Sequence, residues 1–197
     1  LIQKHRVLSP QQILDRIPHL QREGLLGGIS YYDAQMDDAR LCLENILAAR
    51  AKGAHVANYV QALGLIKEQG KTVGAEIQDR LTQRKTTTRA KNILCTVGAW
   101  TNHFWQMDNP SAPAKIRTTK GIHIVYREPV GDTALLLQTK TGGRIFFVIP
   151  WKGQALIGTT DTDYEGYPDR VQATEEDVDY LLTEIQRFFP GKSFDRS

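Results

Sequence analysis

The sequence has little of several features that would mark a specialised class of protein. Only two of its 197 residues are cysteines, Cys42 and Cys95, and they form neither a CxxC pair nor a ligand cluster, which argues against a zinc site or a disulfide framework. We expect both thiols to be buried and reduced, in a cytoplasmic compartment. No apolar run approaches the roughly 18 residues of a membrane span, so no transmembrane segment is expected.

A large charge of either sign is also missing, because the formal net charge is +3. This charge is too small and too evenly spread to favour a nucleic-acid partner. The one basic run, RLTQRKTTTRAK at residues 80–91, has no aromatic residue among its cations, whereas single-stranded nucleic acids stack on aromatic side chains. We therefore expect this run to be a solvated strand edge and the protein to have no nucleic-acid partner.

Familiar catalytic and ligand-binding motifs are absent too. The sequence contains no GxSxG elbow, no HExxH pair and no GxGxxG dinucleotide fingerprint. GLIKEQGKT resembles a phosphate loop, but five residues separate Gly64 from Gly70 where the motif requires four, and the strand-like TVGAEIQD follows where it requires a helix. A hairpin turn is the better interpretation of this stretch.

The stretch DTDYEG, residues 161–166, begins like the calcium loop of an EF-hand. Oxygen-bearing side chains occupy its first, third and fifth positions and glycine its sixth, but Gln172 stands at the twelfth, where a bidentate glutamate is needed. The preceding residues, RIFFVIPW, are typical of a strand and not of a helix. We expect no metal site; Asp161 and Asp163 instead bond local backbone N–H groups where a strand leaves its sheet.

Capping residues and apolar periodicity predict an α+β chain. Ser9, Asp37, and Thr174 with Asp177 at capping-box spacing mark three helix starts. The second of these helices has an apolar face made of Leu41, Leu43, Ile46 and Leu47. A glycine and an expected strand follow this helix, and that order of elements is typical of a parallel α/β sheet. Expected helices cover residues 10–17, 37–52, 98–105 and 174–189; expected strands cover part of 25–35, 55–61, an antiparallel meander ending in a buried strand at 93–97, and later strands at 116–128, 133–139, 143–151 and 154–160.

One histidine differs from the other four, which have no partner at ligand or triad spacing. His123 lies on an expected strand, three residues after Lys120 and two after Gly121, a residue type that lets a ligand approach the backbone. On composition alone a packed histidine is favoured over a functional one.

Four stretches taken together resemble a single family: YYDAQMDDARLCLENILAARAKGA, NILCTVGAW, TTKGIHIVY and RIFFVIPWKGQALIGTTDTDYEG. They are similar to the FAD-dependent glycerol-3-phosphate dehydrogenases, respiratory flavoenzymes of the D-amino-acid-oxidase-like superfamily. The resemblance covers about residues 25 to 185 and implies an α+β fold, in which an antiparallel substrate-domain sheet with helices accompanies an incomplete piece of an FAD-binding domain. Residues 30–101 would then belong to the FAD-binding part, with the meander, and residues 102–190, joined by 1–29, to the substrate-binding part.

The resemblance also implies a reaction and roles for individual residues. The reaction is oxidation of sn-glycerol 3-phosphate to dihydroxyacetone phosphate, with hydride transfer to FAD and electrons passed to a quinone. The sequence departs from the family pattern at Val97, where threonine is usual, at Ala99, where proline is usual, and at Ile122, where serine is frequent. The carried-over roles are general base for His123, substrate contact for Lys120 and Thr160, and proximity to FAD for Ala62, Gly98, Ala99 and Trp100.

The family's dinucleotide fingerprint and its phosphate-gripping arginine have no counterpart in this sequence, so the resemblance implies an internal fragment. FAD is expected in the full-length enzyme and not tightly bound to the fragment, which we expect to be inactive alone. Expected partners are glycerol 3-phosphate and quinone, with peripheral contact at the inner face of the cell membrane and homodimerisation through exposed apolar surfaces. Two alternatives stay open: a related FAD-dependent oxidase that uses oxygen, and a non-catalytic binding module.

Overall fold

The computed structural model describes residues 4–140 and 142–196 and divides into two compact units. One unit combines Leu1–Asp33 with Thr118–Ser197, and the other is Ala34–Arg117. The sequence grouped residues 102–117 with the substrate-binding part, whereas the structure places them in the same unit as the meander. The assignment of one unit to substrate and the other to FAD stays a prediction.

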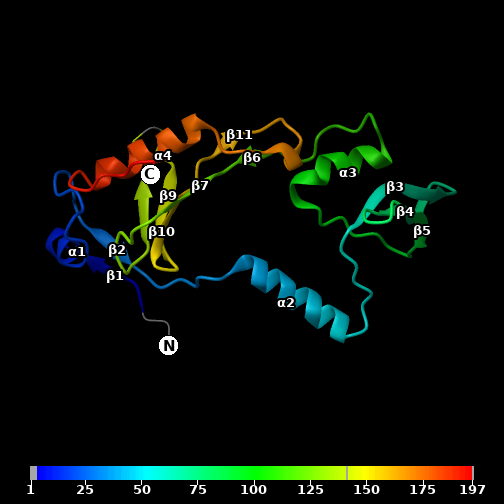
Figure 1. The fold of residues 1–197 in the computed structure, drawn as a ribbon, viewed down its shortest axis with the longest axis horizontal. Coiled ribbons are helices and arrows are strands. Elements are labelled where there is room, and N and C mark those ends of the chain that lie inside the picture. The colour runs from blue at the N-terminus through cyan, green and yellow to red at the C-terminus, as the bar shows by residue number, and fades with distance from the viewer. Residues whose placement is uncertain (1–3, 141, 197) are drawn as a thin grey trace. The chain divides into compact units, whose positions relative to one another are not determined.

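An antiparallel sheet of four strands forms the centre of the larger unit (Figure 1). Lys152 and Gly153 both have positive φ, of 50° and 81°, and form the tight turn between its two central strands. The four strands that the second half of the sequence predicts are confirmed. They are β7 (His123–Tyr126), β8 (Leu135–Gln138), β9 (Ile145–Trp151) and β10 (Gln154–Gly158), in the spatial order β7-β10-β9-β8.

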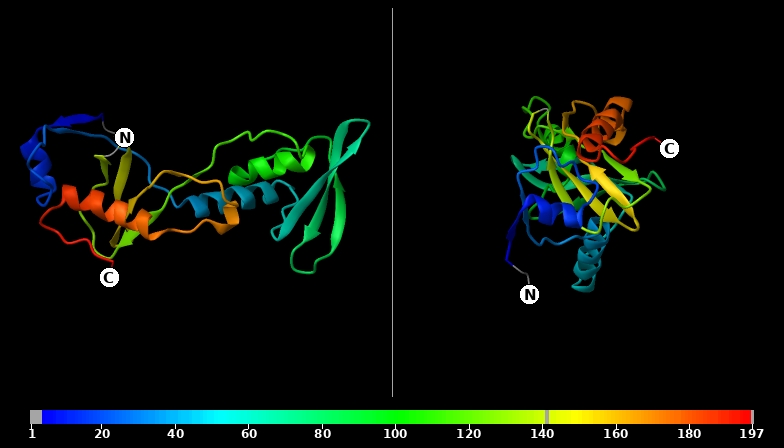
Figure 2. Two further views of the ribbon diagram at one scale, coloured as in Figure 1. Left: turned by 90° about the horizontal axis from the view of Figure 1, so that it is seen from above. Right: turned by 90° about the vertical axis from the view of Figure 1, so that its left-hand side faces the viewer.

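Helix α4 (Glu175–Phe188) packs on one face of this sheet and closes the core (Figure 2). Side chains alternate between the two faces of a strand, so Phe146 on β9 and Ile157 on β10 both point inward and are fully buried. Leu181 and Ile185 of α4 are fully buried as well. Each such side chain stabilises the fold by about 1.5–3 kcal/mol relative to an exposed one, so this layer holds the sheet and α4 as one body.

Ser9 caps the first helix as expected, and Gln12 completes a capping box with it. The Ser9 hydroxyl accepts the N–H of Gln12 at 3.3 Å, and the Gln12 side chain accepts the N–H of Ser9 at 2.9 Å. Ile13 and Leu14 then add to the core described above. The remaining elements of this unit are β1 (Arg6–Leu8), which pairs with β2 (Gly28–Ser30), α1 (Pro10–Arg16), β6 (Thr119–Lys120), which pairs with β11 (Thr162–Asp163), and η2 (Pro168–Arg170).

The smaller unit contains the expected antiparallel meander. Gln69 and Gly70, with φ of 49° and 77°, form its first hairpin turn, so the stretch that resembles a phosphate loop is a turn. The basic run supplies β5, which is exposed at every position, and the prediction of a solvated strand edge is confirmed. The elements are α2 (Asp38–Ala51), β3 (Val60–Glu68), β4 (Lys71–Asp79), β5 (Lys85–Arg89), η1 (Gly98–Trp100) and α3 (Thr101–Asp108).

Several expectations for the smaller unit were wrong. Residues 93–97 are not a buried strand, and Leu94 is 86% exposed. The strand expected at 55–61 begins only at Val60, as part of the meander, and every ladder between described residues is antiparallel. A strand forms only where a neighbouring strand can bond its backbone N–H and C=O groups. Among the described residues, no parallel strand lies beside residues 55–59, so these residues do not form one. Cys42 is exposed and Cys95 half-buried, so the free thiols are not both buried.

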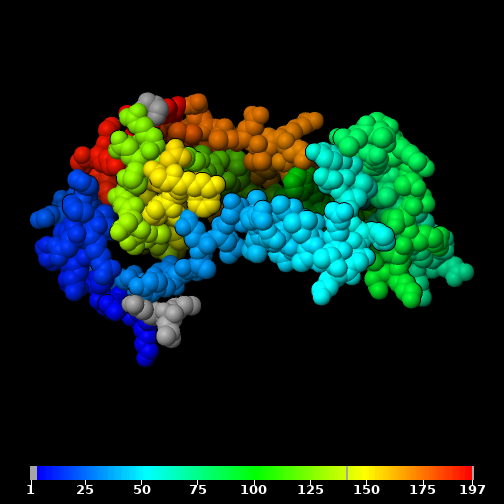
Figure 3. All heavy atoms as spheres, turned by 60° about the horizontal axis from the view of Figure 1, so that its bottom comes forward, coloured from blue at the N-terminus to red at the C-terminus, as the bar shows by residue number. Residues whose placement is uncertain are grey.

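Helix α2 forms where its caps predict, but its apolar face is not covered. Asp37 is the N-cap and accepts the N–H of Arg40 at 3.1 Å, yet no residue of α2 is buried. The four apolar residues of that face, Leu41, Leu43, Ile46 and Leu47, are 40–49% exposed, and α2 (light blue) lies at the surface in Figure 3. In the part of the chain that the structure describes, no helix has both the length and the hydropathy of a membrane span.

Candidate functional site

His123 is the first residue of β7 and lies on the exposed face of the four-stranded sheet. Its cross-strand partner on β10 is Gly158, and Gly158 in turn faces Phe147 on β9. Directly paired residues point to the same side of a sheet, so the three form one row on this face. The imidazole lies against the glycine, because a Cβ added at Gly158 would be 2.7 Å from His123 Cδ2. Val125 and Phe147, 55% and 38% exposed, place apolar surface beside the imidazole.

Thr160 continues the contact with the β7 segment after β10 ends. Its hydroxyl accepts the N–H of Ile122 at 3.0 Å, and its own N–H donates to the Ile122 carbonyl at 3.4 Å. Gly121 makes this close approach feasible, because a Cβ there would lie 3.0 Å from the Thr160 carbonyl oxygen and 2.5 Å from Thr159 Oγ1. Thr160 is only 5% exposed. Its hydroxyl oxygen therefore joins the segment after β10 to Ile122, the residue before His123.

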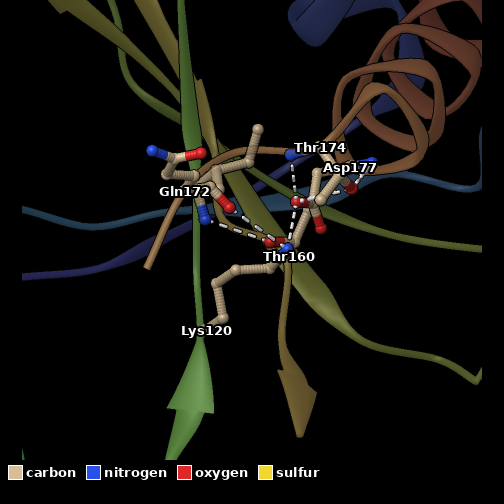
Figure 4. Close-up of polar contacts among 6 residues, drawn as sticks. Lys120, Thr160, Gln172, Thr174 and Asp177 are labelled. Carbon is tan, nitrogen blue, oxygen red and sulfur yellow. Dashed lines mark hydrogen bonds and ion pairs between the residues drawn. The ribbon is translucent and has the colours of Figure 1, made fainter. Parts of the chain in front are cut away.

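Lys120 points toward the start of α4 (Figure 4). Its ammonium group donates to Asp177 Oδ2 at 2.5 Å and to the Gln172 carbonyl at 3.4 Å. The Lys120 and Asp177 side chains are 10% and 6% exposed, so the ion pair is largely withdrawn from water. The cation that the family resemblance directs to the substrate thus has a carboxylate partner within the chain.

Asp177 accepts hydrogen bonds from its own capping box as well. Its Oδ2 accepts the N–H of Thr174 at 2.8 Å and the Thr174 hydroxyl at 3.1 Å, and the N–H of Asp177 donates to that hydroxyl oxygen at 3.4 Å. Burial by itself raises the pKa of Asp177, but the hydrogen bonds from Lys120 and Thr174 outweigh burial and hold the pKa below its ordinary value. The carboxylate is therefore ionised at neutral pH and pairs with the ammonium of Lys120.

An open groove of about 410 Å³ runs between β7 and the start of α4. Residues 122–127 line the strand side, with His123 among them, and Val178 and Leu182 line the helix side. Arg196, also in the lining, forms ion pairs with Glu175 and with Asp179 of α4. His123 therefore borders both this groove and the exposed face of the sheet.

The residues expected near FAD all lie in the smaller unit. Ala62 is half-buried on β3, next to a break in the register with β4. Gly98, Ala99 and Trp100 form η1 and are exposed. Gly98 has a φ of 54°, and nothing lies within 4 Å of the position a Cβ would take. A bare, accessible backbone of this kind fits a cofactor that is contacted through main-chain groups.

The stretch DTDYEG follows the end of β10 at Gly158, and within it only Thr162 and Asp163 form a strand. Thr162 and Asp163 pair with Lys120 and Thr119 as the β11–β6 ladder. The Asp161 carbonyl accepts a hydrogen bond from Arg144, so this residue contributes its backbone and not the expected side-chain bond. Among residues 4–140 and 142–196, no three His, Cys, Asp or Glu side chains gather as metal ligands would.

His123, Lys120 and Thr160 were predicted from the sequence, and the structure brings their segments together. The sequence did not indicate the role of Gly158, which packs against the imidazole, and it indicated Asp177 only as part of a helix cap. The pairing of Lys120 with Asp177 spans 57 positions. The sequence shows an acid, Asp177, at the third position of a helix and a lysine, Lys120, in a strand. Neither residue indicates that the other is its partner.

Comparison with known proteins identifies the family. The whole chain, residues 1–197, matches the family described as DAO, FAD dependent oxidoreductase. An alpha-glycerophosphate oxidase of Enterococcus casseliflavus is 40% identical over 189 residues, which cover 93% of this chain and 31% of that protein. The aerobic glycerol-3-phosphate dehydrogenase of Staphylococcus aureus is 34% identical over 193 residues, which cover 96% of this chain and 34% of that protein.

Solved structures agree with this match. The glycerol-3-phosphate dehydrogenase of Bacillus halodurans, complexed with FAD, has a TM-score of 0.85 and 34% identity over 96% of this chain and 38% of its own. A glycine oxidase of Geobacillus kaustophilus, with a TM-score of 0.65 and 22% identity, shares the fold alone. The chain spans about a third of the length of the curated relatives it matches. The chain belongs to the FAD dependent oxidoreductase family.

Proposed function

We propose that this chain is part of a flavoenzyme that oxidises sn-glycerol 3-phosphate to dihydroxyacetone phosphate. The observation that carries the proposal is the match over 93–96% of the chain to relatives and a solved structure whose names specify glycerol 3-phosphate oxidation. When bound, FAD supplies the acceptor for the hydride that leaves C2. Ala62 and the exposed segment 98–100 would contact it through backbone groups. The chain holds no GxGxxG fingerprint, so we propose that alone it neither retains FAD nor turns over substrate.

His123 is the proposed general base. It is exposed, it lies in a row with apolar Phe147, and its imidazole packs against the bare backbone of Gly158. The imidazole of histidine is the side chain that most often serves as a general base, and here it would remove the C2 hydroxyl proton. Thr160 fixes the segment that carries this imidazole and is proposed to contact substrate through its hydroxyl proton.

Substitution of His123 tests this assignment. In the FAD-loaded enzyme that contains this chain, His123→Gln should lower kcat by about 100-fold or more, because positioned acid–base groups contribute factors of about 10² to 10⁴. His55→Gln is the matched control, since His55 is exposed and belongs to the other unit, and it should leave kcat unchanged. A His123→Gln enzyme with the kcat of the control would exclude His123 as the base.

We propose a quinone as the electron acceptor, with peripheral membrane contact by the whole enzyme. Oxygen is a second candidate, because the relatives at 37–40% identity are named oxidases. Hydrogen peroxide formed in step with dihydroxyacetone phosphate would identify oxygen as the acceptor. Reduction of a soluble quinone analogue in air, without peroxide, would identify the quinone.

Self-association of the isolated chain is proposed from its uncovered apolar side chains. Exposed apolar side chains lie on α2 and on the outer face of the four-stranded sheet, where Val125 and Ile145 are 55% and 53% exposed. Burial of this apolar surface between two copies would favour association. Size-exclusion chromatography of the isolated chain should show a dimer or larger species. A monomer at high concentration would contradict the proposal.

A further inference from the structure

The ion pair between Lys120 and Asp177 joins two elements of the larger unit, the short strand β6 and the first turn of helix α4. Asp177 lies in the first turn of α4, whose inner face is fixed in the core by Leu181 and Ile185. Lys120 lies on β6, three residues before His123. The contact therefore ties the strand segment before the candidate base to a helix that is anchored in the core.

The ladder geometry carries this tie from Lys120 to the site. Lys120 pairs with Thr162 on β11, and the residue after Gly121, Ile122, bonds Thr160 through both its N–H and its carbonyl. Each residue between Lys120 and His123 is thus held in turn. Lys120 has a strand partner, Gly121 lies close to the backbone of Thr160, and Ile122 makes two hydrogen bonds. Little freedom is left for His123 to move while Lys120 is held.

The surroundings of Lys120 disfavour a second anion. The first turn of α4 carries Glu175, Glu176 and Asp177. A phosphate dianion bound to Lys120 would be repelled by these negative charges. It would also leave the Asp177 carboxylate buried without a cation, which is strongly destabilising in a protein. The Gln172 carbonyl, 3.4 Å from the ammonium group, occupies a further donor position of Lys120.

We propose that Asp177 is a positioning residue that holds His123 and Thr160 in place through Lys120, and that Lys120 serves as this anchor instead of binding the substrate phosphate. The proposal deepens the proposed function and rests on it where it refers to the reaction. It replaces the substrate contact that the family resemblance implies for Lys120 by a contact within the chain.

A double-mutant cycle in the FAD-loaded enzyme that contains this chain tests the proposal. The variants are Lys120→Met, Asp177→Asn and their combination; asparagine still accepts the Thr174 hydrogen bonds, and the combination leaves no unpaired charge. Each single variant should lower kcat by about 10- to 100-fold through displacement of His123, with KM changed by less than about threefold. The combined variant should lower kcat no further than the more damaging single variant, because all three variants break the same contact.

A phosphate-binding lysine gives the opposite pattern. Lys120→Met would then raise KM by about tenfold or more, as expected for loss of a charge-assisted hydrogen bond, and Asp177→Asn would not restore it. That pattern overturns the proposal. Glu128→Gln is the control, since its carboxylate pairs with Lys192 at 3.3 Å and is 56% exposed, and it should change kcat and KM by less than about twofold.

Amide hydrogen exchange gives a readout that does not depend on turnover. In each single variant, protection at the amides of Ile122 and Thr160 should fall, whereas protection of Gln21, whose N–H donates to Phe188 at 2.7 Å, should not. The combined variant should lower protection at these two amides no further than the more damaging single variant. An equal loss at all three amides would show general destabilisation and overturn the positioning role. If the wild-type enzyme does not oxidise glycerol 3-phosphate, the proposed function fails, but the exchange cycle still decides the anchor.

Discussion

Gly158 is the residue whose substitution tests the site geometry most severely. It stands at the end of β10 opposite His123, and a Cβ built there would lie 2.7 Å from His123 Cδ2 and 2.7 Å from the Ile122 carbonyl oxygen. The imidazole can rotate away, but the carbonyl belongs to the backbone that Thr160 bonds. Gly158→Ala therefore forces the segment carrying the candidate base away from β10.

The expected cost follows from these contacts. Overpacking of a tight site costs about 1–3 kcal/mol, and the gain from a stiffer unfolded chain, about 0.4–1 kcal/mol, offsets part of it. Gly131→Ala is the matched control, because nothing lies within 4 Å of the Cβ position at Gly131, so only the gain applies. The two variants should differ in free energy of unfolding by about 1–3 kcal/mol, which separates their melting temperatures by several degrees.

Urea unfolding of both variants and the kcat of the FAD-loaded enzyme measure the two consequences of Gly158→Ala. We expect lower stability and a kcat reduced by about tenfold or more, because a shift of the base by a fraction of an ångström weakens proton transfer. Equal stability and equal kcat for Gly158→Ala and Gly131→Ala would refute the close approach of His123 to β10.

Three further predictions concern the core, a helix cap and the buried carboxylate. Phe146→Ala removes a fully buried ring whose centroid lies 5.8 Å from that of Phe188, and should lower the free energy of unfolding by about 3–5 kcal/mol in chemical denaturation. Ser9→Ala removes the capping hydroxyl of α1 and should cost about 1 kcal/mol by the same measurement. The pKa of Asp177 is lower in the folded than in the unfolded chain, so its stabilising effect is complete above the unfolded pKa of about 3.9 and is lost as pH falls through the folded pKa; Asp177→Asn should flatten the loss of stability with falling pH in that acid range.

Each of these predictions has a result that contradicts it. A Phe146→Ala protein as stable as the parent would mean that β9 and α4 do not pack as described. A Ser9→Ala protein of unchanged stability would mean that the capping box does not order α1. An Asp177→Asn protein whose stability falls with pH as steeply as that of the parent would place the acid-sensitive carboxylate elsewhere.

The fold of the larger unit could be predicted from local patterns. The strands of the sheet alternate polar and apolar residues or carry aromatic runs between clear turns, and the capping boxes at Ser9 and Thr174 fix the helix starts. Most of the errors fall in the smaller unit, where burial was inferred from apolar residues alone, whereas in the larger unit the β6–β11 ladder was not predicted. The apolar run at 93–97 and the apolar face of α2 look like core positions, but burial depends on a packing partner, which a local pattern does not report.

In the candidate site, too, residues within recognisable motifs could be predicted, whereas contacts between residues far apart in the sequence could not. His123 and Thr160 were found because their motifs resemble a family. The partnership of Lys120 with Asp177 was not found, because it depends on how a strand and a helix 57 positions apart pack together. Gly158 was not found either, since nothing in the sequence reports which residue faces a given histidine across a ladder.

Anaerobic mixing of the FAD-loaded enzyme that contains this chain with glycerol 3-phosphate tests the central claim most directly. We predict that the flavin absorbance bleaches in a single turnover, that one equivalent of dihydroxyacetone phosphate forms, and that glycine produces no bleaching. Flavin that stays oxidised with glycerol 3-phosphate but bleaches with glycine would contradict the proposed substrate while leaving the family assignment intact.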